Sequence, residues 1–216
     1  MKYPRTPHLP GSPGMTKDDK LISMEALAYL KGQEVVVTEK LDGENSTLLR
    51  HGSHARSLDS SHHESRSWLK RFAADFQFEI PDDYRICGEN LYAKHSIFYD
   101  SLPSYFMVFS IWIEDFVLSW DDTKEWCDML GLTLVPELYR GPWDDKKIAA
   151  CMTGKSRFGA EQEGYVVRVA SEFRLSTPTL QHVVKWVRKG HVQTDPHWMT
   201  SEIIPNKLME VANEGR

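Results

Sequence analysis

The chain contains four short apolar stretches, each of which carries a charged residue that a buried strand does not ordinarily hold. The β-branched run 35–37 leads into Thr38-Glu39-Lys40 and then into an Asp42-Gly43 turn. Runs of this kind are typical of buried strands. The other three stretches repeat the pattern at 86–92 with Glu89, at 163–169 with Glu163 and at 182–187 with Lys185. We therefore predict buried strands that bring two lysines and two carboxylates together at their ends.

Strand and helix patterns are interleaved along the chain. Strand composition occurs over 35–40, 45–50, 85–92, 105–112, 116–120, 163–169 and 182–187. Helical spacing of apolar residues occurs over 24–31, 61–76, 122–130, 144–153 and 205–213. The interleaving predicts an α+β fold in which antiparallel sheets carry helices on their outer faces. We expect one domain over residues 1–216, with an irregular, proline-rich and glycine-rich N-terminal arm over 1–20 and a C-terminal extension over 189–216.

Composition narrows the class of protein. A net charge of −5 excludes proteins that coat nucleic acid by bulk electrostatics. Basic blocks at 50–71 and 185–198 flank an acidic block at 114–147, and a solvated face is the plain explanation for each block alone. The three scattered cysteines are best explained as free thiols of a reducing compartment. Residues 1–15 lack the apolar core of a secretory signal, and no stretch approaches the roughly 20 apolar residues of a membrane span. We expect a cytoplasmic protein with no membrane partner.

Lys40 is the strongest candidate for a reactive side chain. A lysine at the end of a buried strand can present its amine to a cleft, where desolvation or nearby cations would lower its pKa and make it nucleophilic. Gly43 leaves room for a phosphate to approach. Each feature taken singly also has a plain structural explanation. Lys-x-Asp-Gly is an ordinary hairpin connection, and Glu89 could be an acid exposed at a sheet edge. The aromatic residues of 105–112 could simply fill the core. Taken together, these groups suit a nucleoside triphosphate, a divalent metal and a covalent lysine intermediate.

The order of five motifs resembles that of the covalent nucleotidyltransferases, which are the ATP-dependent ligases and mRNA capping enzymes, and most of all that of the RNA ligases. The motifs are Lys-x-Asp-Gly at 40–43, Gly-Glu at 88–89, Phe-Ser-Ile-Trp at 109–112, Glu-Gly-Tyr-Val-Val-Arg at 163–168 and Val-Lys-Trp-Val-Arg at 184–188. The resemblance implies an α+β nucleotidyltransferase (ATP-grasp-like) ligase core of antiparallel sheets flanked by helices, without an oligonucleotide-binding barrel.

The resemblance also implies a set of site residues. Lys40 would be the nucleophile that takes AMP from ATP, with Asp42 and Lys185 as further catalytic residues. Phe109 would stack on adenine, and Glu163 and Glu89 would be the ligands of Mg²⁺ or Mn²⁺. The residues implied to hold the nucleotide are Glu39, Lys40, Gly43, Arg56, Glu89, Phe109, Glu163 and Lys185. Those implied to contact nucleic acid are Asn45, Arg56, Arg188 and Lys189, and the stretch 189–195 with Trp198 would extend that track.

Three features depart from the family pattern. Val187 occupies the place where a second basic residue often stands in the last motif, and Arg188 follows it. Ser110 stands where many relatives have aspartate. Only 28 residues follow Arg188, too few for a five-stranded barrel. The short segment after Arg188 favours a minimal, single-domain ligase over a capping enzyme.

The predicted function is that of an ATP-dependent RNA ligase acting in RNA repair. It would transfer AMP from Lys40 to an RNA 5′-phosphate and join that end to a 3′-hydroxyl, with ends prepared by a partner kinase or phosphatase. Two alternatives stay open: a DNA ligase core that seals DNA or hybrid nicks, and a non-catalytic nucleic-acid-binding scaffold with a decayed ligase fold. Asn45 argues against the first alternative, and the intact set Lys40, Glu89, Glu163 and Lys185 argues against the second.

Overall fold

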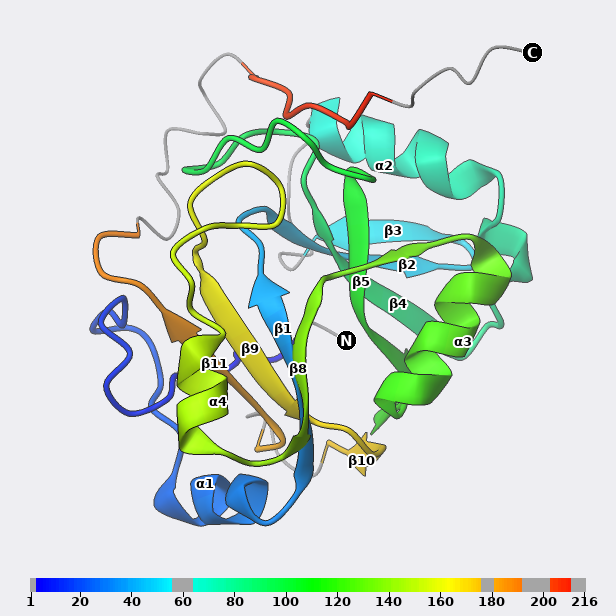
Figure 1. Cartoon of the computed structure of the whole chain (residues 1–216). Coiled ribbons are helices and arrows are strands. Elements are labelled where there is room, and N and C mark those ends of the chain that lie inside the picture. Colours follow the sequence, from blue (N-terminus) through cyan, green and yellow to red (C-terminus); the bar gives the residue numbers. More distant parts are fainter. Residues whose placement is uncertain (1–2, 56–63, 176–180, 192–202, 211–216) are drawn as a thin grey trace, which may run out of the picture.

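The protein folds into two sheets with helices on their outer sides (Figure 1). The computed structural model describes residues 3–55, 64–175, 181–191 and 203–210. The helices are α1 (Met24–Lys31), α2 (Glu64–Ala74), α3 (Trp120–Leu130), α4 (Asp145–Ala150) and the 3₁₀ turn η1 (Gln77–Glu79). The strands are β1 (Glu34–Lys40), β2 (Glu44–Leu49), β3 (Gly52–Ala55), β4 (Tyr84–Asn90), β5 (Phe106–Ile113), β6 (Phe116–Val117), β7 (Thr133–Leu134), β8 (Glu137–Pro142), β9 (Gly164–Val169), β10 (Phe173–Arg174) and β11 (Val183–Val187). The predicted α+β class is confirmed.

The smaller sheet places both candidate lysines on one face. Its strand order is β11-β9-β1-β8, and all of its pairs are antiparallel. Val166 of β9 lies opposite Thr38 of β1 on one side and opposite Lys185 of β11 on the other. Residues directly opposite one another share a face, and so do residues two apart along a strand. Lys40, two residues beyond Thr38, therefore projects from the same face as Lys185.

The larger sheet supplies the facing wall. Its order is β10-β6-β5-β4-β2-β3, with β7 paired in parallel beside β5. Asn45 of β2 lies opposite Glu89 of β4, so these two side chains share a face. The pairing of β4 with β5 shifts between Cys87 and Gly88, and this shift leaves Phe109 as an extra, unpaired residue on β5. A bulge of this kind re-aims a side chain and is common beside binding sites.

Successive side chains of β1 pack against different parts of the core. Val35 and Val37 of β1 pack in a core that includes Leu30 of α1 and Ile148 of α4, on the outer side of the smaller sheet. Val36 points the other way, into a cluster with Met107 of β5. On the far side of the larger sheet, α2 and α3 contribute apolar residues to a third cluster (Figure 1). No helix in the described part of the chain is long and apolar enough to cross a membrane.

Some local predictions are wrong. The helix expected over 205–213 is absent from 203–210, where the chain runs extended and forms bridges at Pro205 and Leu208; residues 211–213 lie outside the described part. Tertiary hydrogen bonds replace the helical ones: Asn206 donates to the carbonyls of Tyr92 and Leu91 and accepts from the Tyr99 amide. The expected strand 116–120 ends at Val117, because Ser119 caps α3. Strands β3, β7, β8 and β10 were not predicted.

Candidate functional site

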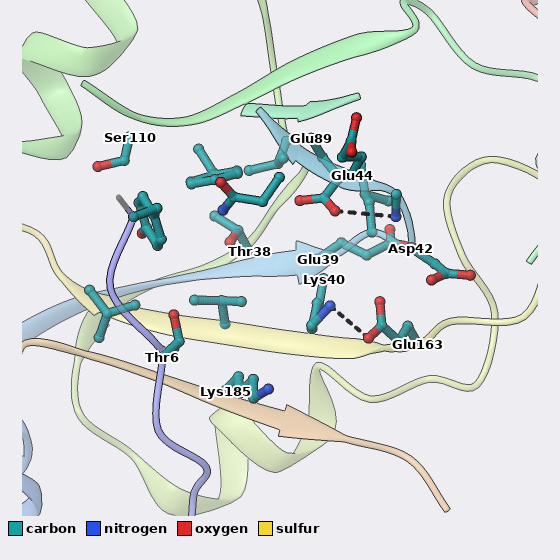
Figure 2. A pocket seen from close by; sticks show the side chains of 18 of the residues that line it. Thr6, Thr38, Glu39, Lys40, Asp42, Glu44, Glu89, Ser110, Glu163 and Lys185 are labelled. Carbon is teal, nitrogen blue, oxygen red and sulfur yellow. Dashed lines mark hydrogen bonds and ion pairs between the residues drawn. The ribbon is translucent and has the colours of Figure 1, made fainter. Parts of the chain in front are cut away.

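A cavity of about 390 Å³ lies between the two sheets and brings most of the sequence-predicted site residues together (Figure 2). Its walls come from β1, β9 and β11, from β2, β4 and β5, and from the N-terminal arm. The predicted residues that line it are Glu39, Lys40, Asp42, Gly43, Asn45, Glu89, Phe109, Glu163 and Lys185.

Lys40 forms the central ion pair of this cavity. Its Nζ lies 2.6 Å from Oε1 of Glu163, which is 1% exposed and immediately precedes β9. Burial lowers the pKa of Lys40, but the carboxylates of Glu163, Glu89 and Asp42 outweigh burial and leave that pKa above its ordinary value. Desolvation acts in the expected direction, but the carboxylates reverse the expected net lowering of this pKa. Without a ligand, Lys40 is an ammonium ion.

Asp42 is fixed by a turn that the sequence reading did not assign to the site. Its Oδ2 accepts hydrogen bonds from the Ser96 amide (2.8 Å), the Ser96 hydroxyl (2.7 Å) and the Ile97 amide (2.7 Å). Its own amide donates to the Tyr99 hydroxyl at 2.9 Å. Burial raises the pKa of Asp42, yet the hydrogen bonds from His191 and Ser96 prevail and hold it well below the usual range. The carboxylate is therefore ionised and rigid.

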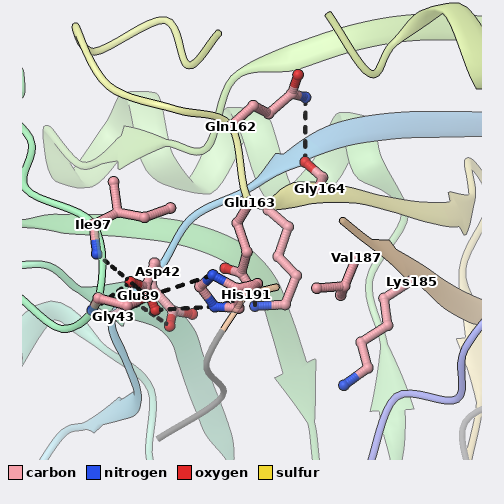
Figure 3. Close-up of polar contacts among 12 residues, drawn as sticks. Asp42, Gly43, Glu89, Ile97, Gln162, Glu163, Gly164, Lys185, Val187 and His191 are labelled. Carbon is pink, nitrogen blue, oxygen red and sulfur yellow. Dashed lines mark hydrogen bonds and ion pairs between the residues drawn. The ribbon is translucent and has the colours of Figure 1, made fainter. Parts of the chain in front are cut away.

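His191 is a buried residue of the site that the sequence placed only in a nucleic-acid track. Its Nε2 lies 3.1 Å from Oε1 of Glu163 and 3.5 Å from Oδ1 of Asp42 (Figure 3). Burial lowers the pKa of His191, but the two carboxylates raise it to about 9. The imidazolium is therefore charged at neutral pH. No local motif marks it, because its role depends on the chain folding back after β11.

Glu89 and Gly43 hold each other across the cavity. The Gly43 amide donates to Oε1 of Glu89 at 3.2 Å (Figure 3). A Cβ atom at position 43 would stand 2.6 Å from the carbonyl oxygen of Asn90, so only glycine fits beside β4. Burial raises the pKa of Glu89 to about 8, with contributions from Glu163 and Asp42 and against the opposing charge of Lys40.

Three buried polar atoms at the cavity have no hydrogen-bond partner among the described residues. They are Oε1 of Glu39, Oδ1 of Asn45 and Oε2 of Glu163. Buried polar atoms are nearly always satisfied in folded proteins, so exceptions gathered in one cavity indicate groups reserved for a ligand. Glu39 is otherwise held by the Arg157 amide, which donates to its Oε2 at 3.2 Å.

Phe109 presents an aromatic surface at the other end of the cavity. Tyr3 of the N-terminal arm meets the Phe109 ring edge-on, with centroids 5.4 Å apart, and also contacts Trp112. Ser110, whose hydroxyl accepts from the Trp112 indole at 2.7 Å, completes this wall. A planar base is the kind of ligand that such a surface binds.

Oxygen and nitrogen atoms of Asp42, Glu163 and His191 lie within 4.8 Å of one another and could hold a metal ion, which would displace the extra proton from the His191 ring. The unpartnered Oε2 of Glu163 fits this use, since carboxylate oxygens suit Mg²⁺ and Mn²⁺. The structure brings Glu163 into this group but not Glu89, whose metal role stays a prediction.

Four residues predicted to contact nucleic acid are not among the described residues that line this cavity. The guanidinium of Arg188 pairs with Glu161 at 2.7 Å, and neither Arg188 nor Lys189 lines the cavity. Arg56 lies outside the described residues, as does Trp198. Their roles in binding nucleic acid stay predictions.

Comparison with known proteins gives a consistent result. Residues 33–187 match the sequence model of the family described as RNA ligase. Three structures of Naegleria gruberi RNA ligase share the fold: an apo variant (TM-score 0.55, 18% identity, 76% of this chain and 52% of that one), the enzyme with pyrophosphate (0.56, 19%, 81% and 56%) and a variant with ATP and Mn (0.56, 18%, 85% and 61%). This chain thus spans roughly half of the length of those proteins. No curated protein matches it.

Proposed function

The chain belongs to the RNA ligase family, and we propose that it is an ATP-dependent RNA ligase that forms a lysine–AMP intermediate on Lys40. The observation that carries this proposal is the position of Lys40. Its amine pairs with Glu163 inside a cavity that also holds Lys185, an aromatic surface and three unsatisfied polar atoms. A nucleophilic lysine, a cationic group for phosphate and a platform for a base are what nucleotidyl transfer requires.

In the first proposed step, Nζ of Lys40 attacks the α-phosphorus of ATP. The Lys40 ammonium first gives up one proton to solvent. A P–N bond then forms, the bond from the α-phosphorus to the bridging oxygen breaks, pyrophosphate leaves, and Nζ gives up a second proton to solvent. Asp42, Glu163 and His191 are the residues that would hold Mg²⁺ or Mn²⁺, which supplies charge neutralisation for carboxylate and phosphate oxygens. Once Nζ no longer pairs with Glu163, burial and the nearby Lys185 favour the neutral amine.

The remaining proposed steps return Lys40 to its starting state. An RNA 5′-phosphate oxygen attacks the phosphorus of lysine–AMP, so the P–N bond breaks and an RNA–adenylate anhydride forms. A 3′-hydroxyl then attacks the 5′-phosphate, a phosphodiester forms and AMP leaves. The free amide oxygen of Asn45 supports a contact to one of these ends. Alignment of the reacting atoms contributes much of the acceleration in steps of this kind.

The proposed setting is the repair of broken RNA in the cytoplasm. An enzyme of this chemistry consumes 5′-phosphate and 3′-hydroxyl ends, which a kinase or phosphatase would supply. Cys87, Cys127 and Cys151 are all free and buried, which fits a reducing compartment.

Intact mass after incubation with ATP and Mg²⁺ tests the proposal. The native protein should gain one AMP, and Lys40→Ala should gain none. The exposed Lys31→Ala, whose side chain pairs with Asp145 at the surface, is the matched control and should react like the native protein. Adduct on Lys40→Ala, or no adduct on a native protein free of prior AMP, would contradict it. Sealing of a 5′-phosphorylated RNA nick compared with the same DNA nick then decides between RNA and DNA ligase.

A further inference from the structure

We propose that Asp19 of the N-terminal arm is a positioning residue for Lys185, so that the arm is a working part of the adenylylation site. The proposal rests on the function proposed above, in which Lys185 faces the phosphates of ATP. It adds a pair of residues, Asp19 and His8, that lie outside the five motifs and outside the 33–187 segment of family similarity.

The arm runs beside β11, where His8 forms an isolated parallel bridge with Lys185. The Leu9 amide donates to the carbonyl of Lys185 (2.8 Å), the Lys185 amide donates to the carbonyl of Pro7 (2.9 Å), and the Gly14 amide donates to the carbonyl of Val187 (2.9 Å). A Cβ atom at position 14 would overlap the neighbouring β11 backbone, so Gly14 permits this approach. The arm also carries Tyr3 and Thr6 to the cavity wall, and Figure 2 shows Thr6 on the same side of the site as Lys185.

Asp19 has one oxygen fixed and one oxygen aimed at the lysine. Its Oδ2 accepts from the amide (3.0 Å) and the hydroxyl (2.9 Å) of Thr16. Its Oδ1 lies 3.3 Å from Nζ of Lys185. The two side chains are 16% and 13% exposed, so the pair is screened less than a surface ion pair.

His8 is a buried neighbour of Asp19. It is fully buried, and its Nε2 lies 3.4 Å from Oδ1 of Asp19. The Ser12 hydroxyl accepts from the Val187 amide at 2.9 Å and lies 2.8 Å from Nδ1 of His8. The single hydroxyl hydrogen can go either to Nδ1 or to the Val187 carbonyl oxygen, which lies 3.4 Å away, and Nε2 of His8 makes no hydrogen bond among the described residues. Burial is the main reason that the pKa of His8 falls to about 4, so the ring is neutral at physiological pH and adds no charge beside Lys185.

The consequence is that the ammonium group of Lys185 is already in position before ATP binds. A lysine side chain is long and flexible, and ordering it during the reaction costs rotamer entropy. Asp19 orders the side chain before the reaction by holding Nζ at the cavity wall. Its carboxylate also opposes burial and the charge of Lys40, which together lower the pKa of Lys185.

A double-mutant cycle under single-turnover conditions tests the proposal. We expect Asp19→Asn, which keeps the size of the side chain, to slow lysine–AMP formation at saturating ATP about 10-fold to 100-fold. Asp19→Glu should restore part of the rate. The control is Asp18→Asn, an exposed neighbour whose side chain makes no hydrogen bond or ion pair with the described residues, and it should react at the native rate. Thermal melting of each variant verifies that the arm and the sheet remain folded.

The cycle is completed in a Lys185→Ala background. If Asp19 acts through Lys185, adding Asp19→Asn there should change the rate by less than two-fold, whereas a purely structural role predicts the same loss again. Long incubations with radiolabelled ATP measure the slow variants, and ATP affinity in a Lys40→Ala background provides the same cycle without turnover. The proposal would be overturned if Asp19→Asn reacted at the native rate, or if its loss of rate and that of Lys185→Ala were fully additive. Adduct formation by the native protein would still support the ligase function in either case. A native protein that forms no adduct would remove the proposed function itself.

Discussion

Lys40 is protonated by its surroundings, and Glu163 contributes most to that state. The Nζ–Oε1 distance of 2.6 Å makes this the closest of the carboxylates whose charge raises the pKa of the lysine. Burial acts in the opposite direction. A site of this kind stores a nucleophile in an unreactive form until its ion pair is exchanged for contacts with the ligand.

Glu163→Gln should therefore separate two properties of Lys40. Removing the negative charge lowers the pKa of the lysine, so an amine-reactive reagent should label Lys40 faster at a given pH than in the native protein. Adenylylation should fall in the same variant, because a carboxylate of the proposed metal group is gone. The exposed Glu161→Gln, two residues earlier, is the control. Slower labelling of Lys40 in Glu163→Gln would contradict this account of the pair.

His8 should make the protein sensitive to mild acid. Its pKa is about 4 in the folded chain and 6.5 when exposed, so between these values the unfolded chain binds more protons. The contribution of neutral His8 to the free energy of unfolding is fully present above pH 6.5. It falls as the pH drops toward 4, by at most about 3 kcal/mol. Urea unfolding of native protein and His8→Gln should show their difference shrinking over that window. The control is His51→Gln, a side chain that is 76% exposed; a constant difference would sink the assignment.

Site residues could be predicted where the chemistry is local in the sequence. Lys40, Asp42, Glu89 and Glu163 stand beside short apolar strands in recognisable motifs, and they meet in the cavity as expected. His191 and Asp19 could not be found this way. Each becomes a site residue only because a distant segment folds back onto a strand, and nothing in its neighbours announces that contact.

The same limit applies to whole elements. The β-branched run of β1 identifies itself, whereas β8 contains Gly141 and Pro142 and gains its strand form from pairing with β1. The segment 203–210 has helical spacing, yet it pairs with the loop after β4. Propensity is a weak prior that tertiary hydrogen bonds override. Elements with a continuous apolar face were predictable, and elements defined by a partner were not.

The segment 203–210 should act as a clamp on the loop that positions Asp42. The Asn206 side chain, 2% exposed, accepts from the Tyr99 amide and donates to the Leu91 carbonyl, both at 2.8 Å. Asn206→Ala leaves two buried groups unpaired, at a cost of about 2–4 kcal/mol in the free energy of unfolding. Urea unfolding measures the loss. The exposed Lys207→Ala is the control, and equal stability of the two variants would contradict the clamp.

At the scale of the molecule, the cavity is the place where separately packed parts meet. One core cluster lies around the smaller sheet with α1 and α4, and another lies under α2 and α3. Both sheets and the N-terminal arm contribute to the cavity wall. The binding energy of one ligand therefore acts on both halves of the fold at once.

ATP with Mg²⁺ should consequently slow hydrogen exchange in both sheets and not in one alone. At a ligand concentration 100 times the dissociation constant, binding stabilises the folded chain by about 2.7 kcal/mol, which slows globally exchanging amides about 100-fold. Lys40→Ala protein keeps the complex non-covalent. Protection should appear in β1, β9 and β11, in β2, β4 and β5, and in residues 3–20. Fraying amides at the ends of α3, which exchange locally and lie away from the cavity, serve as the internal control. Protection confined to the smaller sheet would mean that the larger sheet does not contribute to the nucleotide site, and the roles of Glu89 and Phe109 would then have to be abandoned.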